Sequence, residues 1–155
     1  MTATTQNRNT PSISGHRRGY PVAAGAECLA GTIAVIDSKG LVQSAKEDAG
    51  LIAVGVFEAR VDNREGQDGE QSAEVLRGFM RLENSADDDA ITAADTGKVC
   101  FIADNQTVAK TDDGGKRSIA GIVDSVDEVG VWVLIDPTSG VLLTAPETTT
   151  DGAAE

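Results

Sequence analysis

Two stretches of similar sequence decide the fold: Gly31–Glu58 reads GTIAVIDSKGLVQSAKEDAGLIAVGVFE, and Gly97–Asp124 reads GKVCFIADNQTVAKTDDGGKRSIAGIVD. In both, a glycine opens an apolar strand, a polar turn and a second short strand follow, and a polar loop leads to an apolar strand that contains a glycine. Similarity at one fixed spacing is typical of a duplicated structural unit. We therefore predict a duplicated strand unit with an offset of 66 residues. The identical pairs are Gly31 and Gly97, Ile36 and Ile102, Val42 and Val108, and Gly55 and Gly121.

Each copy has the pattern of a hairpin with a returning strand. The predicted turns are Asp37–Gly40 in the first copy and Ala103–Gln106 in the second, and both contain residues that tolerate a positive φ. Gly55 and Gly121 lie inside apolar strand patterns. A glycine in that position indicates a bulge or a close approach of another backbone.

The remaining body adds two further strands and one short helix to the prediction. The stretch 73–82 predicts a strand with Gly78 as a bulge, and Asp87–Ala94 predicts a short helix with acids at its N-terminal end. Val129–Ile135 is almost wholly apolar, so we expect both of its faces to be covered. Aromatic residues make up 3% of the chain, so Val, Ile, Leu and Ala must fill the core. The predicted fold is mainly β, a small β-barrel or β-sandwich (β-tulip-like) with at most one short helix.

Charge and composition divide the chain into three segments. Residues 1–19 form a predicted extended basic arm, which carries Arg8, Arg17 and Arg18 and no acidic residue. Residues 20–136 form the β-rich body, and residues 137–155 form an acidic, partly flexible tail in which 140–144 has a short strand pattern. The arm holds +3, so the rest holds 10 basic and 25 acidic residues, or −15. Such an arm is either a solvated terminus or a segment that orders on an acidic partner.

The net charge of −12 excludes some classes of partner. An acidic surface repels nucleic acids and anionic membranes, and no apolar run approaches the ~20 residues of a membrane span. Residues 1–10 lack the apolar stretch of a signal peptide. We expect a protein that is made in a cytoplasm and binds neither nucleic acid nor membrane.

The sequence offers little for catalysis. Its only histidine is His16, which lies in the arm, so a histidine-dependent nucleophile would have to use a residue outside the predicted core. Cys28 and Cys100 are too few for a disulfide framework, and we expect buried thiols. We therefore predict no enzyme and no catalytic residue.

Two motifs resemble ligand sites only superficially. The acidic triplet Asp87–Asp89 lacks the spacing of a calcium loop, and Asp113–Ser118 lacks the first glycine of a phosphate loop, where Lys110 stands. We expect no metal and no cofactor. Hydrolysis of a sugar by paired carboxylates is an alternative that stays open. Sugar sites usually offer aromatic side chains, whereas most aromatic residues here lie in predicted strands and favour the core. Tyr20 and Trp132 are alternatively interface anchors, and the predicted partner-binding residues are Arg8, Arg17, Arg18, Tyr20 and Trp132.

The second copy contains a more specific signature. Gly97–Asp112, Gly114–Ser118, Ala120–Val123 and Gly130–Val133 resemble head proteins encoded beside major capsid genes in Mu-like tailed phages and prophages. The first copy, with Ala30–Val35 and Ala53–Phe57, is similar to the strand pattern of phage capsid cement proteins, and the resemblance covers roughly residues 24–136. It implies a β-rich decoration protein, usually trimeric, that clamps neighbouring subunits of the major capsid protein on the outside of an icosahedral head.

Two functions therefore stand as expectations. The first is a virion structural protein, assembled in the bacterial host cytoplasm, that stabilises an expanded capsid from its exterior. The alternative is a β module that binds a small molecule or a carbohydrate, or a tail or spike component of the same particle. An oligomer is expected in the first case, as a dimer or a trimer.

Overall fold

The computed structural model describes residues 2–140, and it is mainly β, as predicted. Helical structure in these residues is limited to two 3₁₀ helices, η1 (Asp87–Asp89) and η2 (Ala93–Asp95), in place of the single helix predicted over 87–94. The strands are β1 (Arg17–Pro21), β2 (Glu27–Cys28), β3 (Ile33–Ile36), β4 (Val42–Ser44), β5 (Ile52–Phe57), β6 (Val61–Asp62), β7 (Ser72–Leu76), β8 (Gly78–Asn84), β9 (Val99–Ile102), β10 (Thr107–Ala109), β11 (Ile119–Val126) and β12 (Val131–Ile135).

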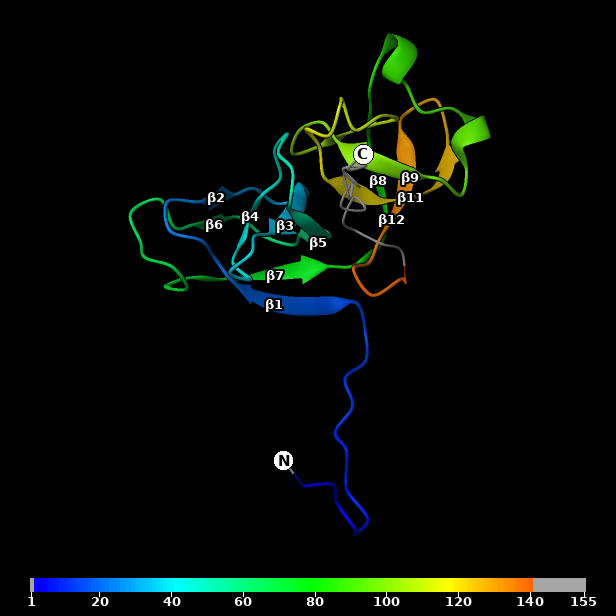
Figure 1. Cartoon of the computed structure of the whole chain (residues 1–155). Helices are drawn as coiled ribbons and strands as arrows, with labels where there is room; N and C mark the ends of the chain where they lie inside the picture. The colour runs from blue at the N-terminus through cyan, green and yellow to red at the C-terminus, as the bar shows by residue number, and fades with distance from the viewer. Residues whose placement is uncertain (1, 141–155) are drawn as a thin grey trace, which may run out of the picture.

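The strands form two units that lie side by side (Figure 1). The N-terminal unit (residues 17–76) is a five-stranded sheet in the order β1-β7-β5-β3-β4, with the small ribbon β2-β6 beside it. The C-terminal unit (residues 78–135) is a closed barrel in the order β8-β12-β11-β9-β10. The two orders match strand for strand, so residues 17–135 contain two copies of one strand topology.

Strand register confirms the duplicated unit. The pair Ile36↔Val42 recurs as Ile102↔Val108, and Ala34↔Gly55 recurs as Cys100↔Gly121. The equivalence continues into strands without sequence identity, because β7 pairs with β5 and β1 as β12 pairs with β11 and β8. The duplication is therefore longer than the two quoted stretches.

The two strand glycines allow a close backbone approach, as predicted. A Cβ on Gly55 would lie 2.1 Å from the carbonyl oxygen of Leu76, and a Cβ on Gly121 would lie 2.1 Å from that of Leu134. The register also shifts next to both glycines, in the β3-β5 and β9-β11 pairs. Only hydrogen fits at these positions, so the same steric reason explains both identities.

The units differ at the seam that closes the sheet. In the C-terminal unit, β8 and β10 form a parallel ladder and the Glu83 N–H donates to the Gln106 carbonyl at 2.9 Å. In the described part of the N-terminal unit, the single bridge Val22↔Val42 joins the residue after β1 to β4. Pro21 holds the place equivalent to Glu83, and proline has no N–H to donate. The first seam is therefore more open than the second.

Two predicted boundaries differ from the structure. The strand predicted over 73–82 is two strands, β7 and β8, which belong to different units and are separated by Arg77 alone. Gly78 is the first residue of β8, has φ +128, and lies where the chain passes from the first unit to the second. The predicted arm 1–19 ends earlier, because β1 begins at Arg17. The alternation of polar and apolar residues does not reveal the break at Arg77, because β7 and β8 follow nearly the same pattern.

Two apolar clusters form the core. One lies inside the N-terminal unit and includes Ala34, Val42, Val54, Phe57 and Val75. The other fills the C-terminal barrel and continues onto the opposite face of the N-terminal sheet. We call that opposite face the outer face, and its members in the N-terminal unit are Ile33, Val35, Ala53, Val56 and Leu76. The second unit therefore covers the outer face of the first.

Candidate functional site

Three of the predicted partner-binding residues lie on β1. The Arg17 side chain pairs with Glu58 and lies 3.9 Å from a Glu74 carboxylate oxygen. Tyr20 is partly buried against the N-terminal core, and its hydroxyl accepts a hydrogen bond of 2.6 Å from Arg77. These side chains already have partners within the chain, so Tyr20 is a core residue with a polar tip rather than an exposed anchor.

The arm that remains is the segment 2–16. All of its residues are exposed, including Ile13 at 75%, and it runs away from the body in Figure 1. The only one of the three arginines in this segment is Arg8, whose Nη1 donates to the Thr10 hydroxyl at 2.7 Å. The predicted charge of +3 is therefore split, because Arg17 and Arg18 belong to the body.

Trp132 lies on the C-terminal unit, on a different strand system from β1. Its indole N–H donates to an Asp127 carboxylate oxygen at 2.9 Å, and the Arg81 guanidinium lies 5.8 Å from its ring centroid. The hydrogen bond from Trp132 lowers the pKa of Asp127, and two backbone N–H groups act in the same direction. Trp132 is partly exposed, so its ring keeps a surface for a partner while its polar edge is fixed.

The two cysteines are free and buried, in different cores. Burial raises the pKa of the Cys28 thiol to about 11 and that of Cys100 to about 12. Thiols held so far above neutral pH are poor nucleophiles, because the reactive form is the thiolate. This placement agrees with the prediction of buried apolar thiols.

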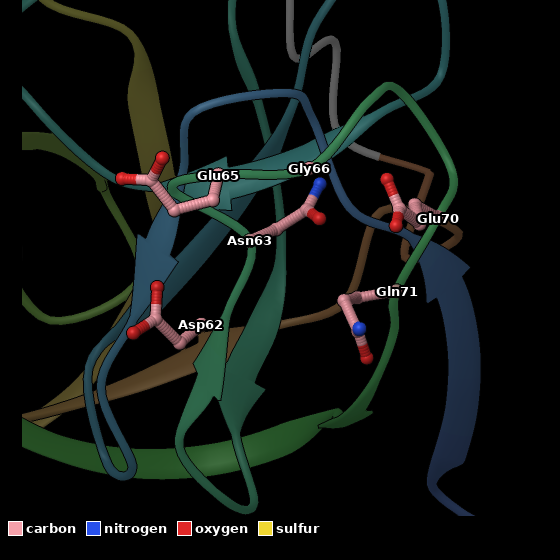
Figure 2. A pocket seen from close by; sticks show the side chains of 6 residues that line it. All are labelled: Asp62, Asn63, Glu65, Gly66, Glu70 and Gln71. Atoms are coloured by element: carbon pink, nitrogen blue, oxygen red, sulfur yellow. The ribbon is translucent and has the colours of Figure 1, made fainter.

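A polar cavity of about 280 Å³ lies beside the loop that follows β6, and Figure 2 shows its lining. The Asp62 carboxylate is held by Arg64, whose hydrogen bonds lower the pKa of Asp62 well below its usual range. The Glu65 carboxylate points away from the other labelled side chains in Figure 2. Within residues 2–140, no group of three or more histidine, cysteine or carboxylate side chains is placed to hold a metal ion.

Asn63 at this cavity has a structural role that the sequence did not suggest. It is 2% exposed, and its amide nitrogen donates to the carbonyls of Ala23 and Gln67 at 3.0 and 2.9 Å. Its Oδ1 has no hydrogen-bond partner, and a Cβ on Gly66 would lie 1.9 Å from it. Asn63 therefore fixes the loop against the start of the sheet, and Gly66 is required by the same packing.

The outer face of the C-terminal unit is the apolar surface that sequence reasoning missed. Four side chains form a row of cross-strand neighbours over β8, β12, β11 and β9. Phe79, expected in the core, is 57% exposed, and the other three are partly exposed. The expectation that both faces of 129–135 are covered is therefore wrong within the described chain. The row consists of Phe79, Leu134, Ile122 and Val99.

A charged cluster joins the two units. Arg117, 12% exposed, donates to Asp89 at 2.6 Å and to Glu47 of the N-terminal unit at 2.8 Å. Burial alone would raise the pKa of Asp89, but hydrogen bonds from Arg117 and Thr111 outweigh it and lower the pKa. The Ser118 hydroxyl adds two bonds across the junction, from the Leu51 N–H at 2.9 Å and to the Asp48 carbonyl at 2.7 Å.

Comparisons with known proteins return nothing: no family model, no curated protein and no solved structure matches the chain. Within the described residues, no helix has the length and apolar character that a membrane crossing requires.

Proposed function

We propose that this protein is a structural component of a virus particle, which binds the outer surface of an icosahedral phage capsid and bridges neighbouring capsid subunits. The observation that carries the proposal is the exposed arm 2–16, attached to a body of two repeated units. An arm that buries nothing on its own body gains no stability there, whereas such segments commonly order on a partner.

Two further features support this function. Residues 20–155 carry −15, and 22 of the 25 acidic residues lie in the body 20–136, which suits a surface that faces solvent and stays apart from packaged DNA. The strings that resemble phage head and cement proteins lie on β9 to β12 and on β3 and β5, and the pair β3-β5 repeats the register of the pair β9-β11. The proposed partners are the major capsid protein and further copies of this chain, as a trimer on the resemblance.

Deletion of residues 2–15 tests the role of the arm. We expect the shortened protein to keep the melting temperature of the full chain, because these residues are exposed and Arg17 keeps its ion pairs. Binding to expanded capsids assembled without this protein should weaken at least about tenfold, which corresponds to ~1.4 kcal/mol. Co-sedimentation with the capsids measures binding, and thermal unfolding measures the fold.

The matched control is Arg8→Ala in the full chain, which removes the arm's arginine and leaves its length. A loss comparable with the deletion would assign the binding to charge, and a small loss would assign it to main-chain contacts along the arm. Unchanged capsid binding by the deleted protein would refute the arm's role, and no binding by the full chain would refute the proposed function.

A small-molecule or carbohydrate module remains the second candidate because of the cavity beside Asn63. Its volume of about 280 Å³ lies at the small end of ligand pockets, and two of its polar side chains, Asn63 and Glu70, are hydrogen-bonded to the main chain of the loop. Glycan-array binding that is lost on Gln71→Ala would favour this candidate.

A further inference from the structure

The interface between the two units shows how an outer face of this topology is covered. The outer face of the N-terminal unit packs against one end of the C-terminal barrel, the end with the turn 103–106 and the start of β11. The Ile33 N–H donates to the Asn105 carbonyl at 2.8 Å, and Ser118 bonds to residues 48 and 51. The packing is therefore face against end.

The equivalent face of the C-terminal unit has no such cover in residues 2–140. Where the N-terminal unit has Val56 and Ile33, 8% and 0% exposed, the C-terminal unit has Ile122 and Val99, both partly exposed. At the end of the row Phe79 stands in the place of Arg17, so this face is more apolar there than its counterpart. A continuous apolar strand such as β12 is typical of strands covered on both faces.

The equivalent end of the N-terminal unit is also present. The turn Asp37–Gly40 corresponds to 103–106, and Ile36 and Ile52 stay partly exposed there although both pack against the N-terminal core. One chain therefore has an uncovered face on its second unit and, on its first unit, the kind of end that covers such a face.

We propose that the outer face of the C-terminal unit, with Phe79 at its edge, binds the Ile36–Ile52 end of the N-terminal unit of a second copy of this chain. The contact repeats between molecules the arrangement that already exists within one molecule, so it continues an interface whose geometry is known. It is head-to-tail, and such contacts close into rings or extend as filaments. The inference concerns the protein alone in solution and does not depend on capsid binding.

Sedimentation velocity of the full chain from micromolar to submillimolar concentration tests the proposal. We expect self-association, and we expect Phe79→Glu to weaken it at least about tenfold, because a carboxylate would be buried in an apolar contact. Phe79 is 57% exposed, so this variant should fold normally, and Ile122→Glu gives a second test of the face. Val129→Glu is the matched control, since Val129 is 60% exposed and lies off the row.

A mixing experiment tests the head-to-tail arrangement. Phe79→Glu disrupts the outer face and Ile52→Lys disrupts the end, so each variant alone should stay monomeric. An equimolar mixture should form a heterodimer, because each variant keeps the surface that the other has lost. Lys39→Glu replaces Ile52→Lys if the latter does not fold. Self-association of the end variant alone would overturn the proposed mode in favour of face-to-face pairing.

Two results overturn the whole inference. One is a full chain that stays monomeric throughout the concentration range. The outer face would then have to be covered by residues 141–155 or by a capsid subunit. The other is a Phe79→Glu variant that assembles as the wild type does. Neither result affects the capsid test of the arm deletion, so capsid binding fails separately, and a monomeric chain would remove only the trimer from the proposed partners.

Discussion

At the scale of single residues, Gly55 and Gly121 are fixed by the space they leave for a neighbouring carbonyl. Each would place a Cβ 2.1 Å from a main-chain oxygen of the next strand, and the backbone has no flexible end that can move aside. Gly55 also has φ +144, a conformation that side chains of L-residues rarely adopt. The sequence could predict the special role of both glycines, because they interrupt apolar strands at equivalent places.

We expect Gly121→Ala to lower the free energy of unfolding by about 2–3 kcal/mol through overpacking, and Gly55→Ala to cost ~1–3 kcal/mol more through backbone strain. Gly19→Ala in β1 is the control, because its Cβ would meet nothing within 4 Å. Urea unfolding of the three variants measures the differences, and equal costs at all three positions would contradict the steric explanation.

At the scale of elements, proline at one strand position distinguishes an open seam from a closed one. Glu83 donates its N–H across the β8-β10 seam, and the equivalent Pro21 has none to donate. The sequence contains this information, yet the polar, basic composition of residues 1–19 places the first three residues of β1, 17–19, in the predicted arm. The strand state of β1 arises from pairing with β7, which is a tertiary contact.

Glu83→Pro should open the C-terminal barrel at this seam and cost about 1–3 kcal/mol, since a hydrogen bond is lost and its acceptor is left without a donor. Glu83→Ala keeps the N–H and should change stability by less than ~0.5 kcal/mol, because Glu83 is exposed. Hydrogen exchange of the β10 amides should accelerate in the proline variant only. Unchanged exchange there would show that the seam does not depend on this bond.

At the scale of the whole molecule, the two units are held together by an apolar face and by the Arg117 cluster. We expect Arg117→Ala to lower the free energy of unfolding by about 1–3 kcal/mol, because it leaves Asp89 and Glu47 without their partner in a partly buried junction. Lys116→Ala is the control, since its pair with Asp113 is exposed and worth little.

The same cluster predicts a pH dependence. The pKa of Asp89 is lower in the folded protein than its ordinary value of 3.8, so the stabilisation is complete above pH 3.8 and is lost as the pH falls through the folded value. Arg117→Ala removes one cause of the lowered pKa of Asp89, so the variant should lose less stability in acid than the wild type does. The difference in stability between the two proteins should therefore shrink as the pH falls. Chemical unfolding at pH 7, 4 and 3 measures it, and a difference independent of pH would contradict the assignment.

The sequence by itself determined the mainly β class, the duplicated hairpin with its returning strand, the two special glycines and the buried thiols, because local alternation, turn residues and burial preferences encode them. Only the tertiary structure decided where the first unit ends, because β7 and β8 are contiguous in sequence and separate in space. It also decided which apolar faces are covered. A strand such as β12 shows that it is apolar on both sides, but whether another unit lies against each side depends on long-range packing. Because no other part of residues 2–140 packs against that side, Phe79 is exposed where its sequence pattern predicted a core residue.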